Sequence, residues 1–310
     1  MPHEVPANCT IETCPHEAVI NYLPVLSGNI LYLIFFGILL LAHTFMGIRY
    51  RTWTFMVGVV LGIFGEMVGY AGRLMMRNDP FNFNTVLISL IPLTLAPALL
   101  SASIYLTLSR IITIRGAHHS RLRPPTYTVL FIACDLTALI LQSAGGAMAS
   151  GSESNPDQGK TGLNIMMAGL AFQVASLALF LGLWAEVDWR ARRGADKRVE
   201  SGDAADMFVG IRNTAAFRRF EIALAISTIL IFIRSIYRVA ELAGGFDSEL
   251  ANNEPLFMVL EGMLIILASG LLAIFHPGPA FGGCWLSAAT ARRPDSADTL
   301  ELGGTTRVMV

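Results

Sequence analysis

The chain has 310 residues, of which 54% are hydrophobic and 15% are charged, and its mean hydropathy is +0.56. This composition supplies too few polar side chains to cover a water-soluble globule, and the net charge of -1 favours no nucleic-acid partner. We therefore expect membrane lipids to be the solvent and the main partners of the protein.

Seven apolar segments are each long enough to cross a hydrocarbon core about 30 Å thick, which needs roughly 20 residues per helix. They cover residues 25–48, 52–76, 85–110, 127–148, 162–185, 220–243 and 256–275. The predicted fold class is all-α, a polytopic seven-transmembrane-helix bundle that occupies residues 25–278 as one membrane domain. The first 24 residues contain neither Lys nor Arg nor an apolar run, so we expect the first helix itself to direct insertion.

Basic residues set the expected orientation, because Lys and Arg accumulate on the cytosolic side of membrane proteins. Outside the predicted helices, all of them except Arg77 and Lys160 fall in segments that are cytosolic when the N-terminus lies outside. Residues 1–24 are therefore expected to form an extracellular or lumenal tail, and residues 279–310 a cytosolic tail whose small polar residues predict disorder. We expect a plasma-membrane location, with an endomembrane as the alternative.

Short motifs outside the helices indicate modification rather than catalysis. Asn8 begins a glycosylation sequon on the expected outer side, and Cys9 and Cys14 form either a small disulfide or two free thiols. Residues 159–161 resemble the end of a phosphate-binding loop, but Ser154 replaces the glycine that this loop needs. We therefore expect no nucleotide site. We also expect no metal site and no cofactor.

Ionisable residues inside the helices are functional candidates, because each costs roughly 2.5–3.5 kcal/mol on membrane insertion. Two helices carry such residues on one stripe each: Glu66, Tyr70 and Arg73 in the second, and Arg234, Tyr237, Arg238 and Glu241 in the sixth. Both helices run in the same direction, so the charges match in depth with opposite sign.

These matched depths predict two charge pairs between the second and sixth helices. Glu66 is expected to meet Arg234 or Arg238, directly or through water. Arg73 is expected to meet Glu241, likewise directly or through water. Two interpretations stay open: the pairs only neutralise each other and lock the bundle, or they line a polar cavity that receives a lipid headgroup.

Three further helices carry polar candidates for the interior. Asp135 and Gln142 share a face of the fourth helix, Gln173 lies near the middle of the fifth, and Glu261 lies in the outer third of the seventh. We expect at least half of these polar residues to share one interior cavity. The second helix also has a small-residue stripe that we interpret as a packing surface, formed by Gly58, Gly62, Gly65, Gly69 and Gly72.

A set of positions spread over residues 22–278 has a recognisable order and spacing. The set comprises Tyr22, Pro24, Asn29, Glu66, Gly69, Tyr70, Arg73, Leu95, Ala96, Pro97, Ala102, Tyr105, Arg110, Asp135, Gln142, Gly145, Gly146, Gln173, Arg234, Tyr237, Arg238, Glu241 and residues 275–278. This pattern resembles the fungal lipid-translocating exporter family, seven-helix proteins associated with movement of sphingoid bases and with resistance to aminocholesterol and other toxic amphiphiles. The resemblance implies a sphingoid-base-like or sterol-like substrate. In the seventh helix, Glu261-Gly262-Met263 keeps the acid usual in this family but not the proline that follows it.

Other classes of protein share the seven-helix topology. A receptor or sensor, or a regulator of another transporter, is the alternative, although the third helix ends in Leu108-Ser109-Arg110 without the acidic neighbour typical of G-protein-coupled receptors. A lipid hydrolase of the ceramidase type needs several His and an Asp around zinc. Only His43 and His276 lie near the membrane here, so an enzyme is not expected.

Overall fold

The computed structural model describes residues 22–78, 83–115, 123–150, 156–194, 208–212, 214–244, 250 and 252–290. The helices within these ranges are α1 Leu26–Tyr50, α2 Trp53–Asn78, α3 Phe83–Arg115, α4 Pro124–Ser150, α5 Pro156–Gly194, α6 Val209–Arg212, α7 Ala215–Ala243, α8 Glu254–Phe257, the π-helix η4 Met258–Met263, α9 Leu264–Ile274, α10 Pro277–Ala280 and α11 Ser287–Thr290. The predicted sites at Asn8, Cys9 and Cys14 lie outside the described residues.

Seven crossings are found in the described part of the chain, each long and apolar enough to span a membrane. They coincide with the seven predicted segments, and several extend further: α5 covers Pro156–Gly194 where 162–185 was expected. The seventh crossing is composite, because α8, η4 and α9 follow one another without a break. The predicted all-α seven-helix fold is confirmed, whereas the orientation of the termini stays a prediction.

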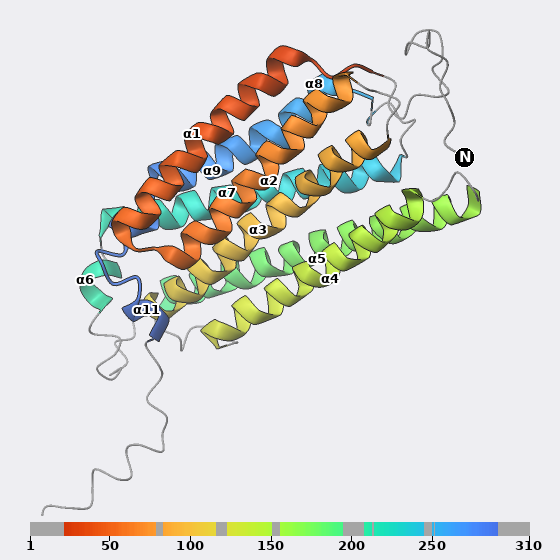
Figure 1. The fold of residues 1–310 in the computed structure, drawn as a ribbon. Helices are drawn as coiled ribbons and strands as arrows, with labels where there is room; N and C mark the ends of the chain where they lie inside the picture. Colours follow the sequence, from red (N-terminus) through yellow and green to blue (C-terminus); the bar gives the residue numbers. More distant parts are fainter. Residues whose placement is uncertain are drawn as a thin grey trace, which may run out of the picture.

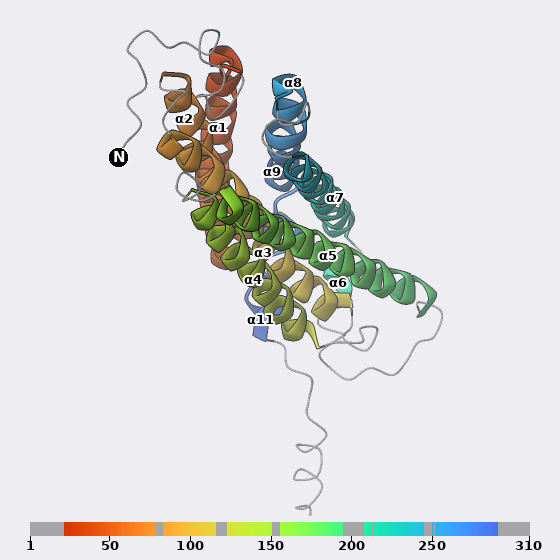
Figure 2. The same cartoon turned by 90° about the vertical axis from the view of Figure 1, so that its right-hand side faces the viewer.

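The crossings form a closed ring in which chain neighbours are also spatial neighbours (Figure 1). Each of the first four helices packs on the next, α5 packs on α7, α7 packs on α9, and α9 returns to α1. In Figure 2, α9 stands beside α7, and α4 runs beside α5. We call the two ends of the bundle the α8 end, where α1 begins and α7 finishes, and the α11 end, where α7 begins and α3 finishes.

The glycine stripe of α2 faces α3. A Cβ added at Gly62 would lie 3.0 Å from the Ala96 carbonyl oxygen, and one at Gly72 would lie 2.7 Å from the Ser89 amide nitrogen. Backbone atoms cannot rotate out of the way, so only glycine lets the two helices approach this closely. The packing interpretation of the stripe is confirmed.

A second close approach joins α4 and α5 at Gly145. A Cβ there would lie 2.5 Å from the Met166 amide nitrogen and 2.6 Å from the Gly162 carbonyl oxygen. We expect Gly145→Ala to cost about 1–3 kcal/mol through overpacking and to lower the melting temperature of the purified protein. Gly182→Ala is the matched control, because a Cβ at that position meets no atom within 4 Å. Equal melting temperatures for the two variants would contradict this packing.

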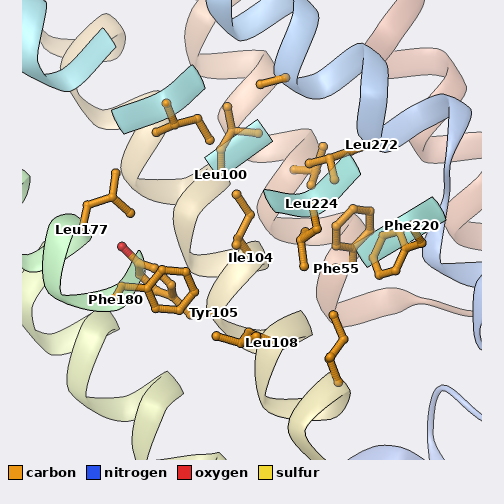
Figure 3. Packing of buried hydrophobic residues seen from close by; sticks show 14 of the residues in the cluster. Phe55, Leu100, Ile104, Tyr105, Leu108, Leu177, Phe180, Phe220, Leu224 and Leu272 are labelled. Atoms are coloured by element: carbon orange, nitrogen blue, oxygen red, sulfur yellow. The ribbon is translucent and has the colours of Figure 1, made fainter. Parts of the chain in front are cut away.

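Apolar side chains fill the interior toward the α11 end (Figure 3). Tyr105 of α3 lies against Phe180 of α5 with ring centroids 4.6 Å apart, while Phe55 and Phe220 form a separate group. Ile104 of α3 lies between the two groups. This half of the bundle interior is therefore closed by tight apolar packing.

The segment after the seventh crossing packs against the bundle. The rings of Phe281 and Trp285 are buried with centroids 5.0 Å apart, and the Arg110 guanidinium carbon lies 3.6 Å from the centroid of Trp285. The expected disorder from Pro279 onward therefore does not apply to residues 279–290, because these aromatic side chains anchor the segment. Residues 291–310 lie outside the described part.

Candidate functional site

A cluster of buried charges lies between α2, α7 and η4. Arg234 of α7 donates through Nη2 to the Leu93 carbonyl oxygen at 2.5 Å and to Glu261 Oε1. Glu66 of α2 is fully buried, and its Oε1 lies 4.0 Å from Arg234 Nη2. The predicted pair of Glu66 and Arg234 is present as a contact, but Arg234 directs its hydrogen bond to Glu261.

The π-helical turn η4 carries Glu261 into this cluster. Such turns are rare and occur frequently at functional sites. Tyr32 of α1 contacts the first residue of this π-helical turn, because its hydroxyl donates to the Met258 carbonyl oxygen at 2.8 Å. Gly262 packs against the side chains of Tyr32 and Tyr70 so closely that a Cβ has no room. The seventh crossing therefore has a local distortion beside its acid although it lacks the proline.

Arg238 extends the cluster toward the α8 end. Its Nη1 donates to Glu241 Oε2 at 2.7 Å, one helical turn away, and its Nε lies 3.7 Å from Glu261 Oε1. The Glu241 side chain is 14% exposed, whereas the Glu261 side chain is fully buried. The charges thus form a continuous series that leads from a partly exposed carboxylate to fully buried ones. Tyr237 lies buried beside Arg238.

Arg73 has partners other than the predicted one. Its Nε donates to Asn29 Oδ1 at 3.1 Å, and its Nη2 donates to the Tyr22 hydroxyl at 3.2 Å and to Glu254 Oε1 at 3.3 Å. The direct form of the predicted Arg73–Glu241 pair is not found among the described residues, because Arg73 pairs with Glu254 at the start of α8 and Glu241 pairs with Arg238. Glu254 was missed because it precedes the predicted seventh segment.

A cavity of about 70 Å³ lies at the α8 end between these charges. Its lining includes the charged side chains of Arg73, Arg238 and Glu241. The rest of the lining is polar at Tyr22, Ser89 and Asn252 and apolar at Met76, Val86, Leu90, Leu93 and Phe257. The cavity is therefore amphipathic: groups of both charge signs lie beside an apolar wall supplied mainly by α3.

The remaining polar candidates form a separate group on α4 and α5. Gln142 Nε2 donates to Gln173 Oε1 at 3.0 Å, and Asp135 lies beside the Tyr105 hydroxyl. None of these residues lines the cavity. The structure therefore divides the predicted set: Glu66, Tyr70, Arg73, Arg234, Tyr237, Arg238, Glu241 and Glu261 lie in or beside the charge cluster, while Asp135, Gln142 and Gln173 lie apart from it.

An ionic latch that the sequence did not reveal joins three helices at the α11 end. Arg115 of α3 donates to both carboxylate oxygens of Glu221 in α7, at 2.6 and 2.5 Å, and to Asp188 Oδ1 in α5 at 2.9 Å. The Arg115 side chain is only 20% exposed. Arg115 was counted among the basic residues that set orientation, and nothing in the sequence pattern paired it with acids far along the chain.

Breaking the latch should loosen the α11 end. Arg115→Gln removes charged hydrogen bonds that contribute roughly 1.5–3 kcal/mol each, so we expect amide hydrogen exchange in Ala215–Glu221 to become about tenfold faster. Arg190→Gln is the control, because it removes only an ion pair to Glu186 within one helix. Equal exchange rates in the two variants would show that the latch does not hold α7 in place.

The fold and the site define a polytopic membrane protein with a buried charge cluster beside an amphipathic cavity. The family model described as RTA1 like protein matches residues 59–283. The chain therefore belongs to the RTA1-like family, which confirms the expected resemblance. No solved structure matches it significantly.

Yeast relatives cover most of the chain. It is 30% identical over 281 residues to the sphingoid long-chain base transporter RSB1 of Saccharomyces cerevisiae, a match that covers 84% of this chain and 73% of the relative. It is 28% identical over 220 residues to protein RTA1 of the same organism, covering 70% of this chain and 64% of that protein. Protoporphyrin uptake protein 1 is 27% identical over 223 residues, covering 71% and 67%.

Proposed function

We propose that this protein moves lipid-like amphiphiles with a charged headgroup across the membrane and so contributes to resistance against toxic amphiphiles. The observation that carries the proposal is the cavity at the α8 end, where Arg73, Arg238 and Glu241 lie beside an apolar wall. A long-chain base has the matching chemistry, with an ammonium group for a carboxylate and a hydrocarbon chain for the apolar wall. The names of the relatives, a long-chain base transporter among them, support this class of substrate.

The charge cluster would lower the cost of moving a headgroup through the membrane interior. A single charge at the bilayer centre costs several kcal/mol, but an ammonium that pairs with a buried carboxylate keeps a partner throughout. The hydrocarbon chain needs no polar partner, because it can stay in contact with lipid. The cavity alone is too small for a whole amphiphile, so the proposal assigns to it the headgroup only.

The expected orientation places the α8 end outside and the α11 end in the cytosol, so this arrangement serves export toward the outer leaflet. We propose the plasma membrane as the location, with an endomembrane as the alternative, and we assign no enzymatic step to the chain. Among the described residues, no three His, Cys, Asp or Glu side chains are grouped in a way that could hold a metal ion.

Reconstitution tests the proposal. Purified protein in liposomes should speed the transbilayer movement of a fluorescent sphingoid base well above the rate in protein-free liposomes. A fluorescent phosphatidylcholine of equal chain length reports on general leakiness of the bilayer. Sphingoid-base movement at the protein-free rate would overturn the proposal and favour a receptor or a regulator of another transporter.

A further inference from the structure

A line of ion pairs connects the cavity to the most deeply buried acid. Glu241 borders the cavity and accepts from Arg238 at 2.7 Å, and Arg238 Nε lies 3.7 Å from Glu261. Glu261 accepts from Arg234, whose Nη2 lies 4.0 Å from Glu66 Oε1. Each Arg therefore lies between two acids and can shift its hydrogen bond from one to the other by a small side-chain movement.

The cluster holds more acid than base. Glu66, Glu241 and Glu261 share two guanidinium groups, those of Arg234 and Arg238, while Arg73 is paired with Glu254. If all three acids were ionised, one carboxylate would lack a compensating charge inside the membrane, which is costly. The surplus falls on Glu66, because neither of its oxygens has a hydrogen-bond partner within the described chain although the side chain is fully buried.

We infer that the surplus negative charge of this cluster is neutralised in turn by a proton on Glu66 and by the ammonium group of the amphiphile at Glu241, so that the protein exchanges protons for cationic amphiphiles. This inference rests on the proposed function and supplies its energy source. It assigns a proton-binding site to Glu66 and a headgroup site to Glu241, at opposite ends of the same line of ion pairs.

The exchange follows from the order of the pairs. An ammonium that enters the cavity pairs with Glu241 and releases Arg238 toward Glu261. Arg238 then replaces Arg234 as the partner of Glu261, and Arg234 moves its hydrogen bond to Glu66. The Glu66 carboxyl loses its proton to water as its O–H bond breaks, and the carboxylate pairs with Arg234. One proton leaves for each ammonium bound, so the charge of the cluster stays constant, and release of the amphiphile on the other side returns a proton to Glu66.

Other titratable groups near Glu66 do not replace it in this role. The groups that face it are Arg234 and Arg238 of α7, Glu261 of η4 and Tyr70 of its own helix, with Tyr32 of α1 against the Tyr70 ring. Tyr70 and Tyr32 are phenols that stay neutral near pH 7. His276 lies beyond the seventh crossing toward the α11 end, and burial lowers its pKa to about 4, so it stays uncharged.

Proton release on binding tests the inference directly. Purified protein in weakly buffered detergent is mixed with N,N,N-trimethylsphingosine, a permanent cation that cannot itself exchange a proton. Wild-type protein should release about one proton for each bound amphiphile. Glu66→Gln should release none even when saturated with the amphiphile, because the amide has the shape of a protonated carboxyl and no proton to give, and its binding should be weaker because the cluster then gains a net charge.

Two controls separate a lost proton site from a damaged protein. Glu66→Gln should keep the wild-type melting temperature, because it replaces a neutral side chain by another of the same size. Glu186→Gln removes a partly exposed carboxylate that is paired with Arg190 near the α11 end, and it should release protons as the wild type does. Binding by the wild type without proton release, or equal release by Glu66→Gln, would overturn the inference.

A liposome experiment distinguishes failure of this inference from failure of the proposed function. With wild-type protein, a pH gradient should accumulate trimethylsphingosine in the leaflet facing the acidic side, and Glu66→Gln should allow equilibration without accumulation. Equal movement in both gradient directions would overturn the exchange of protons while leaving translocation intact. No movement of the amphiphile in any gradient would overturn both.

Discussion

Arg234→Met should prevent the protein from accumulating in a folded form. Arg234 is the only hydrogen-bond donor to the fully buried Glu261 found in the described part of the chain, and it also binds the Leu93 carbonyl oxygen. Removing one partner of a buried ion pair leaves an uncompensated charge and costs about 3–5 kcal/mol, a large part of the total stability of a typical protein. Size-exclusion chromatography of the detergent-solubilised protein should show loss of the monodisperse peak.

Adding Glu261→Gln to Arg234→Met should restore the fold. In Arg234→Met with Glu261→Gln, both members of the pair are neutral, and Glu66 keeps its proton, so no unpaired charge remains. Arg219→Met is the control on the same helix, because this side chain is exposed, and its chromatogram should match that of the wild type. A folded single variant would contradict the assigned pairing, as would a double variant that is no better than the single one.

Glu241→Gln should reduce the transport of amine amphiphiles more than it reduces the stability of the protein. Glu241 is the acidic side chain in the lining of the cavity, and it is partly exposed there. A hydrogen bond to a charged group contributes about 1.5–3 kcal/mol, so the KM for a fluorescent sphingoid base should rise about tenfold to a hundredfold. Initial rates of transbilayer movement at several lipid loadings measure this change.

A neutral amphiphile provides the comparison for this variant. A fluorescent diacylglycerol has no ammonium group, so any movement of it should be unaffected by Glu241→Gln. Glu186→Gln should leave the KM for the sphingoid base unchanged, since its carboxylate is paired with Arg190 far from the cavity. An unchanged KM for the sphingoid base in Glu241→Gln would remove Glu241 from the headgroup site.

The helices were predictable because each one must satisfy a simple physical demand, an apolar length that spans the membrane. The contact between Glu66 and Arg234 was predictable for a related reason: buried charges of opposite sign at equal depth need each other. The partner of Arg73 could not be found in this way. Glu254 lies near the membrane surface at the start of α8, where an acid carries no insertion cost that would mark it.

Helical periodicity also could not tell which face of a helix meets which neighbour. Asp135 and Gln142 were expected to share a face of α4 toward the interior, but Gln142 pairs with Gln173 of α5, Asp135 lies beside Tyr105 of α3, and neither lines the cavity. The latch of Arg115 depends on acids in two other helices, and only the ring arrangement brings them together. The π-turn that places Glu261 had no signal in the sequence, and in the fold its Met258 carbonyl oxygen accepts a hydrogen bond from Tyr32 of another helix.

Binding of the amphiphile headgroup in the cavity at the α8 end is tested most directly by photolabelling in liposomes. The probe is a sphingoid base that carries a diazirine beside its amine, and labelled peptides are identified by mass spectrometry. The label should appear on side chains that line the cavity, such as Met76, Leu93 and Phe257, and excess unlabelled sphingoid base should suppress it. Labelling confined to exposed apolar residues such as Phe45 and Ile140, without competition, would contradict the claim.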